Sequence, residues 1–290
     1  MIRPALALTG ALLTLGFAPA KPVQPFDLAK TPAADWRAIE PDNTIYLDLP
    51  KGRVVIELAP AFAPNHVANI KAIVRSHYFD DSLIVRSQDN YVVQWGAPDD
   101  RKLTAGKEPL KAEFDKAIGA EPFIVLPDPD TYAPQVGFSG DFPAARDPKT
   151  HRTWLTHCYG MVGAARDEGA DTGSGKELYA VIGQAPRNLD RNITVVGRVV
   201  QGMELLSTMP RGTGDLGFYR TEPEKTHILR VRMASDVPAA ERVALEALRT
   251  DSPSFRAFIQ SRRVRTESWY KYSAGRIGLC NIALPVRVKP

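Results

Sequence analysis

The chain is poor in cysteine, in long apolar runs and in net charge. Its two cysteines allow at most one disulfide. Beyond the first twenty residues no apolar run approaches the length of about 20 residues that spans a bilayer, which argues against a bundle of membrane helices. The formal net charge is only +4, and the basic residues are dispersed along the chain. Because a surface that follows phosphates needs clustered Lys and Arg, we do not expect nucleic-acid binding.

The composition is that of a folded globular protein. Hydrophobic residues make up 44% and charged residues 24% of the 290 residues, so disorder is not indicated. This length allows one large domain, or one medium-sized domain with additions, and a sizeable core.

The first twenty residues have the pattern of a secretory signal peptide. A short basic start at 1–3 is followed by an apolar run at 4–17 and by small residues at 18–20. We predict a signal peptide over 1–20 and a periplasmic or secreted mature protein; an uncleaved N-terminal anchor is the alternative. Residues 21–42 are rich in Pro, Ala and charge, which is typical of an arm or linker.

The two cysteines, Cys158 and Cys280, lie far apart in the sequence. Export would place them where a disulfide persists. Sequence separation does not show whether their Cα atoms come within bridging range. A disulfide and two buried free thiols are both open, and we favour the free thiols.

Many short strands and few helices are indicated between residues 43 and 235. Residues 43–58 have the pattern of a β-hairpin around Pro50-Lys51-Gly52, and apolar spacing after Pro64 predicts a helix. Further β-rich runs occur at 83–85, 91–93, 159–162, 178–182, 193–200 and 228–232. Such a series predicts a barrel or a sandwich.

Two segments exceed this core. Residues 119–157 contain many prolines and glycines with few periodic runs, which indicates a long insertion. Residues 236–290 form a tail in which Val243, Ala247, Leu248, Phe255 and others have helical spacing, so we predict a helical extension packed on the barrel. A partner or client surface is the alternative role for both segments.

Three blocks of sequence resemble the cyclophilin family of peptidyl-prolyl cis/trans isomerases. The first runs from Tyr78-Phe79-Asp80 through Arg86 to Gln94-Trp95-Gly96, the second is Gly160 to Arg166, and the third runs from Glu177 to Gly202-Met203. They occur in the family's order and cover most of 43–235. The resemblance implies a mainly β fold, a closed eight-stranded antiparallel barrel capped by helices.

The resemblance also implies an active site without cofactor or metal. Arg86 occupies the position of the family's catalytic arginine, whose guanidinium donates toward the prolyl nitrogen when the amide is twisted. Gln94 occupies the position of the glutamine that steadies this arginine, and Tyr91 that of the aromatic wall of the proline pocket. The same comparison assigns the remaining substrate contacts to Val92, Ala165, Arg166, Glu177, Tyr179, Leu189 and Ile193, with Tyr179 at the pocket floor.

Three positions depart from the family pattern. Glu177 replaces a usual glutamine, Asn188 lies where many members have tryptophan, and Ile193 replaces a usual histidine. We therefore expect weak cyclosporin binding and reduced but measurable isomerase activity. The extra charge of Glu177 would pair with Arg86 or change the peptide preference.

Two other constellations are weaker. His151, His157 and Cys158 match no common zinc spacing. Gly173-Ser174-Gly175-Lys176 lacks the first glycine and the final Ser/Thr of a phosphate loop.

The predicted function is isomerisation of X–Pro bonds in unfolded or partly folded exported proteins, by a monomer. The alternative is a cyclophilin-fold chaperone or binding module with little or no turnover.

Overall fold

The structure is a computed structural model that describes residues 26–98 and 100–290. The predicted signal peptide, residues 1–20, and the first part of the predicted arm lie outside the described residues. Within the part of the chain that is described, no helix is long and apolar enough to cross a membrane.

Nine antiparallel strands form a nearly closed barrel. Around the barrel they are ordered β14 (Thr226–Ile228), β4 (Ser82–Ser87), β5 (Val92–Gly96), β12 (Glu177–Val181), β11 (Met161–Ala164), β13 (Val195–Gln201), β3 (Gly52–Leu58), β2 (Thr44–Leu49) and β15 (Arg230–Met233). Leu229 alone separates β14 from β15, which pair with β4 and β2 at the two ends of the sheet. Counted as one bent strand they give eight, so the predicted mainly β antiparallel barrel is confirmed.

The hairpin β2–β3 shows how the sequence forms the barrel core. Successive side chains of a strand point to opposite faces. Ile45, Leu47 and Leu49 accordingly lie in the cluster inside the barrel, whereas Tyr46 lies in a separate cluster outside it. Because both faces are covered at this point, the alternation of apolar and polar residues is only partial.

Two helices add apolar side chains to the same core. The helix α1 (Pro64–Arg75) begins with proline at a position where no backbone N–H is needed, and it buries Val67, Ile70, Ile73 and Val74. The short α2 (Met203–Ser207) buries Leu206.

The predicted insertion, residues 119–157, forms a second antiparallel sheet together with a short strand just before it. Its five strands are ordered β6 (Lys116–Ala117), β10 (Arg152–Leu155), β9 (Phe142–Asp147), β8 (Gln135–Ser139) and β7 (Ile124–Leu126). We had expected few regular elements here. The strands were missed because they are short and because Gly137 and Pro143, two residues that disfavour strands, lie within them.

The extension is only partly helical, which corrects the prediction for 236–290. The helix α3 (Pro253–Arg263) buries Phe255 and Phe258. Ala247 and Leu248, however, lie in the strand β16 (Leu245–Leu248), which pairs with β1 (Trp36–Ala38) and β17 (Val286–Val288). Pairing with these distant strands overrides the helical spacing. The arm at 21–42 thus contributes a strand to the extension.

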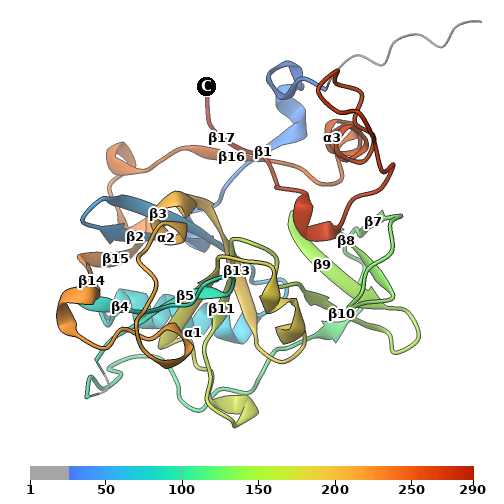
Figure 1. Cartoon of the computed structure of the whole chain (residues 1–290). Helices are drawn as coiled ribbons and strands as arrows, with labels where there is room; N and C mark the ends of the chain where they lie inside the picture. The colour runs from blue at the N-terminus through green and yellow to red at the C-terminus, as the bar shows by residue number, and fades with distance from the viewer. Residues whose placement is uncertain (1–25, 99) are drawn as a thin grey trace, which may run out of the picture.

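The insertion and the extension form one lobe beside the barrel. Figure 1 shows the green strands β7–β10 on the right of the barrel, with the orange helix α3 above them and the red turn of Leu279–Asn281 beside them. A second apolar cluster joins them, with Phe138 and Phe255 in edge-to-face contact at 4.9 Å between ring centroids. The cluster includes outward-facing barrel residues such as Tyr179 and Val181, so the lobe covers part of the barrel's outer face.

A disulfide closes this lobe. Cys158 and Cys280 are bonded, with their Cα atoms 4.9 Å apart, so the preference for free thiols was wrong. The bridge spans 122 residues and ties the extension to the segment that precedes β11.

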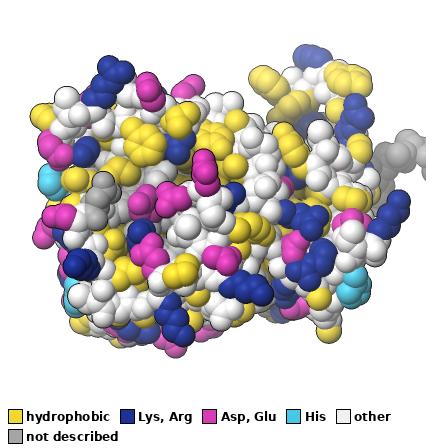
Figure 2. Space-filling model, turned by 90° about the horizontal axis from the view of Figure 1, so that it is seen from below, with side chains coloured by type: hydrophobic (Ala, Val, Ile, Leu, Met, Phe, Trp, Pro, Cys, Tyr) yellow, Lys and Arg dark blue, Asp and Glu magenta, His cyan; other side chains and the backbone are white. Residues whose placement is uncertain are grey.

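Charged side chains are mixed on the molecular surface. On the face shown in Figure 2, Lys and Arg side chains are interspersed with Asp and Glu rather than gathered into one basic region.

Candidate active site

All ten residues predicted for the site line one cavity of about 970 Å³ on the outer face of the barrel. The strands β4, β5 and β12 supply its wall, and the chain after β11 and the short helix at Ala185–Leu189 supply one rim. The ten residues are Arg86, Tyr91, Val92, Gln94, Ala165, Arg166, Glu177, Tyr179, Leu189 and Ile193. The predicted rim residue Asn188 is exposed and is not among the lining residues.

Arg86 lies in β4 and is held in place on three sides. Its Nε donates to the carbonyl oxygen of Leu216 at 2.7 Å, its Nη1 donates to Oε1 of Gln94 at 3.3 Å, and its Nη2 donates to Gln88. Burial lowers the pKa of Arg86, partly offset by Tyr91, but the group stays charged at any physiological pH. Three of its five N–H donors are thus used among the described residues, and two are left for a ligand.

Gln94 and Glu177 fix one another on adjacent strands. Nε2 of Gln94 donates to a carboxylate oxygen of Glu177 at 2.7 Å, while its Oε1 accepts from Arg86. The opposite orientation of the Gln94 amide would place two donors together at the guanidinium and two acceptors together at the carboxylate. The orientation described is therefore the favourable one. Among the described residues Glu177 therefore reaches Arg86 through Gln94, and the direct pairing considered above is not formed.

The apolar part of the cavity lies beside Arg86. Tyr91, Val92, Tyr179, Leu189 and Ile193 line it, and Val92 and Tyr179 belong to the second apolar cluster. The guanidinium carbon of Arg86 lies 5.5 Å from the centre of the Tyr91 ring. A small aliphatic ring seated here would be within reach of a fixed cation.

Ala165 and Arg166 follow β11 at the rim. The backbone N–H of Ala165 donates to the carbonyl of Glu177 at 3.0 Å, which continues the pairing of β11 with β12. The Arg166 side chain donates to the carbonyls of Asn192, Asp167 and Glu168, so it orders the loops around the rim. Its predicted contact with substrate backbone stays a prediction.

Comparison with known proteins places this site in a family. The family described as cyclophilin type peptidyl-prolyl cis-trans isomerase/CLD matches residues 44–233, well over half of the chain. The chain belongs to this family. A probable peptidyl-prolyl cis-trans isomerase from Brucella suis is 28% identical to this cyclophilin over 182 residues, which are 61% of this chain and 76% of that protein. A peptidyl-prolyl cis-trans isomerase from Streptomyces antibioticus is 30% identical over 84 residues, which are 29% and 51% of the two chains.

The fold also resembles a solved structure. The crystal structure of a cyclophilin from Hirschia baltica has a TM-score of 0.68 and 23% sequence identity, and the match covers 88% of this chain and 94% of that chain. This coverage is larger than residues 44–233 alone, so the likeness in fold extends into the parts added to the barrel.

Family membership makes this cyclophilin a peptidyl-prolyl cis-trans isomerase. The reaction rotates an amide bond whose barrier, about 18–20 kcal/mol, comes from resonance of the nitrogen lone pair with the carbonyl. In the twisted state the lone pair is localised and becomes a better hydrogen-bond acceptor. A fixed N–H donor beside a pocket for the proline ring favours that state over either planar isomer.

One loop of this cyclophilin's site was missed from the sequence. Residues 210–222 return beside β4 and place Leu216 and Phe218 over Arg86, with the Phe218 ring centre 5.1 Å from the guanidinium carbon. Gly217 has φ +79° and lies against the backbone of Gln88, where a Cβ would clash. The three glycines at 212, 214 and 217 were a signal of such a close approach to another strand.

Proposed function

We propose that Arg86 is the catalytic residue of this isomerase and that its substrates are X–Pro bonds of exported proteins during folding. The observation that carries the first part is the arrangement around Arg86. A half-buried guanidinium, held by three hydrogen bonds to Leu216, Gln94 and Gln88, keeps two N–H donors beside the apolar part of the cavity, where a proline ring would bind.

Tyr91, Gln94 and the apolar lining residues have supporting roles in this proposal. Gln94 keeps the guanidinium in one orientation, and its second N–H is free to bind a substrate carbonyl. Tyr91, Val92, Tyr179, Leu189 and Ile193 hold the proline ring, so they contribute to substrate binding rather than to the twist itself.

The site is tested by measuring isomerisation of a short Ala-Pro-containing peptide by the mature chain and by Arg86→Ala and Arg86→Lys variants. We expect Arg86→Ala to lower kcat/KM by about 100-fold, the scale for loss of one donor aimed at a transition state. Arg86→Lys should recover little, because the three N–H donors of an ammonium share one nitrogen and cannot reproduce the planar guanidinium that reaches Leu216, Gln94 and a ligand from separate nitrogens. Equal rates for the three folded proteins would refute the role of Arg86.

The proposal that the protein is exported has two supports. The first twenty residues have the three-part pattern of a signal peptide. The disulfide between Cys158 and Cys280 is of a kind that persists in oxidising compartments and is rare in the cytosol. Cell fractionation with N-terminal analysis tests this proposal, which predicts a mature chain that begins near Lys21 outside the cytoplasm. An intact Met1 in the soluble cytoplasmic fraction would contradict it.

The alternative function is a chaperone or binding module with little turnover. Its support is that Leu216, Gln88 and Gln94 already occupy three donors of Arg86. Such a protein would bind Ala-Pro peptides with unchanged affinity in the Arg86→Ala variant and would not accelerate their isomerisation.

A further inference from the structure

A buried polar network lies directly behind the floor of the cavity. The hydroxyl of Tyr179 is 2.8 Å from Nε2 of His157, and the two rings are parallel within 11° with centroids 6.2 Å apart. Tyr179 is only 3% exposed and His157 only 1%. The hydroxyl therefore points away from the cavity, and the ring presents its side to it.

Room for this hydroxyl is built into the neighbouring strand. Gly163 of β11 lies opposite Tyr179 of β12, and a Cβ at Gly163 would lie 2.2 Å from the Tyr179 oxygen. Steric room at Gly163 and a partner in His157 both indicate that the hydroxyl serves a purpose.

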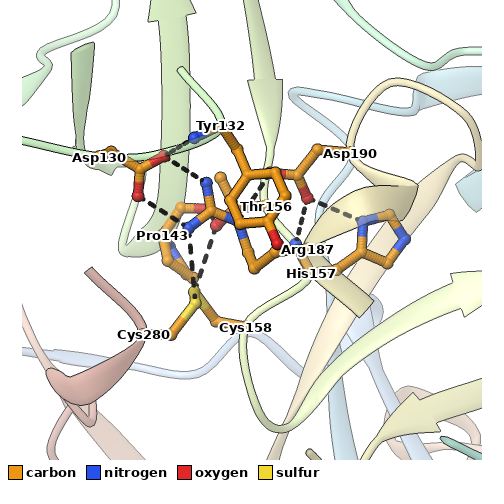
Figure 3. The surroundings of a disulfide bond; sticks show 9 residues. All are labelled: Asp130, Tyr132, Pro143, Thr156, His157, Cys158, Arg187, Asp190 and Cys280. Carbon is orange, nitrogen blue, oxygen red and sulfur yellow. Dashed lines mark hydrogen bonds and ion pairs between the residues drawn. A yellow bond between two sulfur atoms is a disulfide. The ribbon is translucent and has the colours of Figure 1, made fainter. Parts of the chain in front are cut away.

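His157 is in turn fixed by Asp190. One carboxylate oxygen of Asp190 accepts from the backbone N–H of His157 at 2.8 Å and lies 3.0 Å from the ring Nδ1 (Figure 3). A carboxylate at Nδ1 favours the tautomer with the proton on that nitrogen. The other nitrogen, Nε2, then accepts the hydrogen bond from the Tyr179 hydroxyl.

Arg187 connects this histidine to the lobe. Its Nε donates to the second oxygen of Asp190 at 2.8 Å, and its two terminal nitrogens donate to the two oxygens of Asp130 at 3.0 and 2.8 Å. Nη1 also lies 3.9 Å from Sγ of Cys280 (Figure 3). Asp130 belongs to the insertion, Cys280 to the extension, and Cys158 directly follows His157. The insertion, the extension and the barrel thus meet at Arg187 and His157.

We propose that His157, Asp190 and Arg187 are positioning residues that hold the Tyr179 floor, and that the insertion and the extension act on the pocket through them. The proposal deepens the proposed function and rests on it. When the Tyr179 ring is fixed by its hydrogen bond to His157, the proline ring binds at one depth in the pocket. The nitrogen of the twisted amide then lies within hydrogen-bond reach of the Arg86 donors. Where the floor is released, the ring is bound at varying depths, and kcat falls more than KM rises.

A double-mutant cycle between His157 and Tyr179 tests this directly. We expect His157→Ala to lower kcat/KM for an Ala-Pro peptide by about tenfold, within the range of coupled neighbours. In the Tyr179→Phe background, where the hydroxyl is gone, the same substitution should cost less than about twofold. His157→Gln, which can still accept from the hydroxyl, should restore part of the loss. Equal losses in both backgrounds would show that His157 only supports the fold and would overturn the proposal.

Arg263→Ala is the matched control. Arg263 bonds Asp128 of the insertion within the same lobe but makes no contact with the network. Activity within about twofold of the parent is expected for it, while Arg187→Ala should resemble His157→Ala. A comparable loss in Arg263→Ala would mean that the lobe acts through general stability, which contradicts the proposal.

The experiments distinguish an error in the positioning proposal from an error in the proposed isomerase function. Calorimetric affinity for the Ala-Pro peptide and the NMR resonances of the Tyr179 ring report on the floor without turnover. If the parent protein shows no isomerisation, these two readouts still test the cycle. If His157→Ala does not fold, Arg187→Ala and a Cys280→Ser variant carry the same comparison. An unchanged Tyr179 resonance in folded Arg187→Ala and Cys280→Ser would overturn the proposal even if isomerase activity is present.

Discussion

Inside the barrel, most apolar side chains come from strands that are neighbours in the sheet and from the two helices packed on them, whereas the second core collects residues from four separate stretches of chain. Its members include Trp36 of the arm, Phe138 of the insertion, Val181 of the barrel and Phe255 of the extension. In the barrel the alternation within each strand decides which side chains are buried. In the second core the partners are fixed only when distant segments meet.

The insertion has a particular role in that meeting, since three of its aspartates each bind an arginine from a different part of the chain. Asp141 pairs with Arg37 of the arm, Asp128 with Arg263 of the extension, and Asp130 with Arg187 of the barrel. Buried pairs give little net stability after their desolvation, but an unpaired buried charge is costly. These pairs therefore select one way of docking the lobe, and apolar contacts and the disulfide hold it there.

Removal of the disulfide is expected to have the largest effect on stability, and this effect should originate in the lobe rather than in the barrel. Replacing Cys158 and Cys280 together with serine should lower the free energy of unfolding by about 4–5 kcal/mol, because the bridge closes a long loop in the unfolded chain. Denaturant unfolding followed by circular dichroism measures this loss, and reduced parent protein is the control. Equal stability of the oxidised and reduced proteins would show that the lobe docks without the bridge.

Removing apolar volume from each core sharpens the comparison. Phe255→Ala should cost about 3–5 kcal/mol and Ile56→Ala about 2–5 kcal/mol, since both side chains are fully buried. The two variants should differ in which parts of the chain lose protection from hydrogen exchange. Phe255→Ala should raise amide hydrogen exchange in β7–β10 and α3 while the barrel strands stay protected, and Ile56→Ala should raise it throughout. Uniform exchange in both variants would mean that the two cores unfold as one unit.

The barrel and the pocket could be predicted from the sequence, but the lobe could not. The difference lies in whether a residue's environment is set by its own strand or by distant segments of the chain. Arg86, Gln94 and Tyr179 could be placed because each lies in a block with a family resemblance and a regular strand around it. The strands of the insertion are short and interrupted, and β16 has helical spacing although it pairs with β1 and β17. From the sequence, His157 was considered only as a zinc ligand, and its spacing did not support that role. No local pattern indicates that it faces Tyr179, because that contact depends on how β11 and β12 pair.

The insertion's ion pairs should make the lobe sensitive to acid. The hydrogen bond from Arg263 holds the pKa of Asp128 below its usual value against the opposing effect of burial. A carboxyl with a lowered folded-state pKa stabilises fully above its unfolded pKa of about 3.9, and this contribution is lost as the pH falls through the folded value. Asp128→Asn should thus cost about 1.5–3 kcal/mol at pH 7, the range for a hydrogen bond between charged groups, and progressively less below pH 4.

Unfolding curves of the parent and of Asp128→Asn between pH 2 and pH 7 measure this dependence. Asp48→Asn is the barrel control, because Asp48 also has a lowered pKa, which the hydrogen bonds from Arg53 and Arg230 produce against burial. It should show the same pH trend without increased exchange in the lobe. A gap between the parent and Asp128→Asn that does not narrow in acid would contradict the assignment.

The smallest expected effect concerns Glu177, the one departure from the family pattern that contacts the catalytic set. Its carboxylate holds Gln94 and, through it, offsets part of the charge of Arg86. Glu177→Gln keeps an acceptor for Nε2 of Gln94 and removes the negative charge, so kcat/KM should rise by no more than about threefold, a change below 1 kcal/mol. Glu177→Leu keeps neither, leaves the Nε2 of Gln94 without that acceptor, and should lower the rate instead. The same steady-state assay at low and high salt distinguishes the rise in Glu177→Gln from the loss in Glu177→Leu. The rise is electrostatic and should shrink with added salt, because salt screens charges at this half-exposed site. A large loss in Glu177→Gln would instead show that the negative charge itself is needed to hold Gln94 against Arg86.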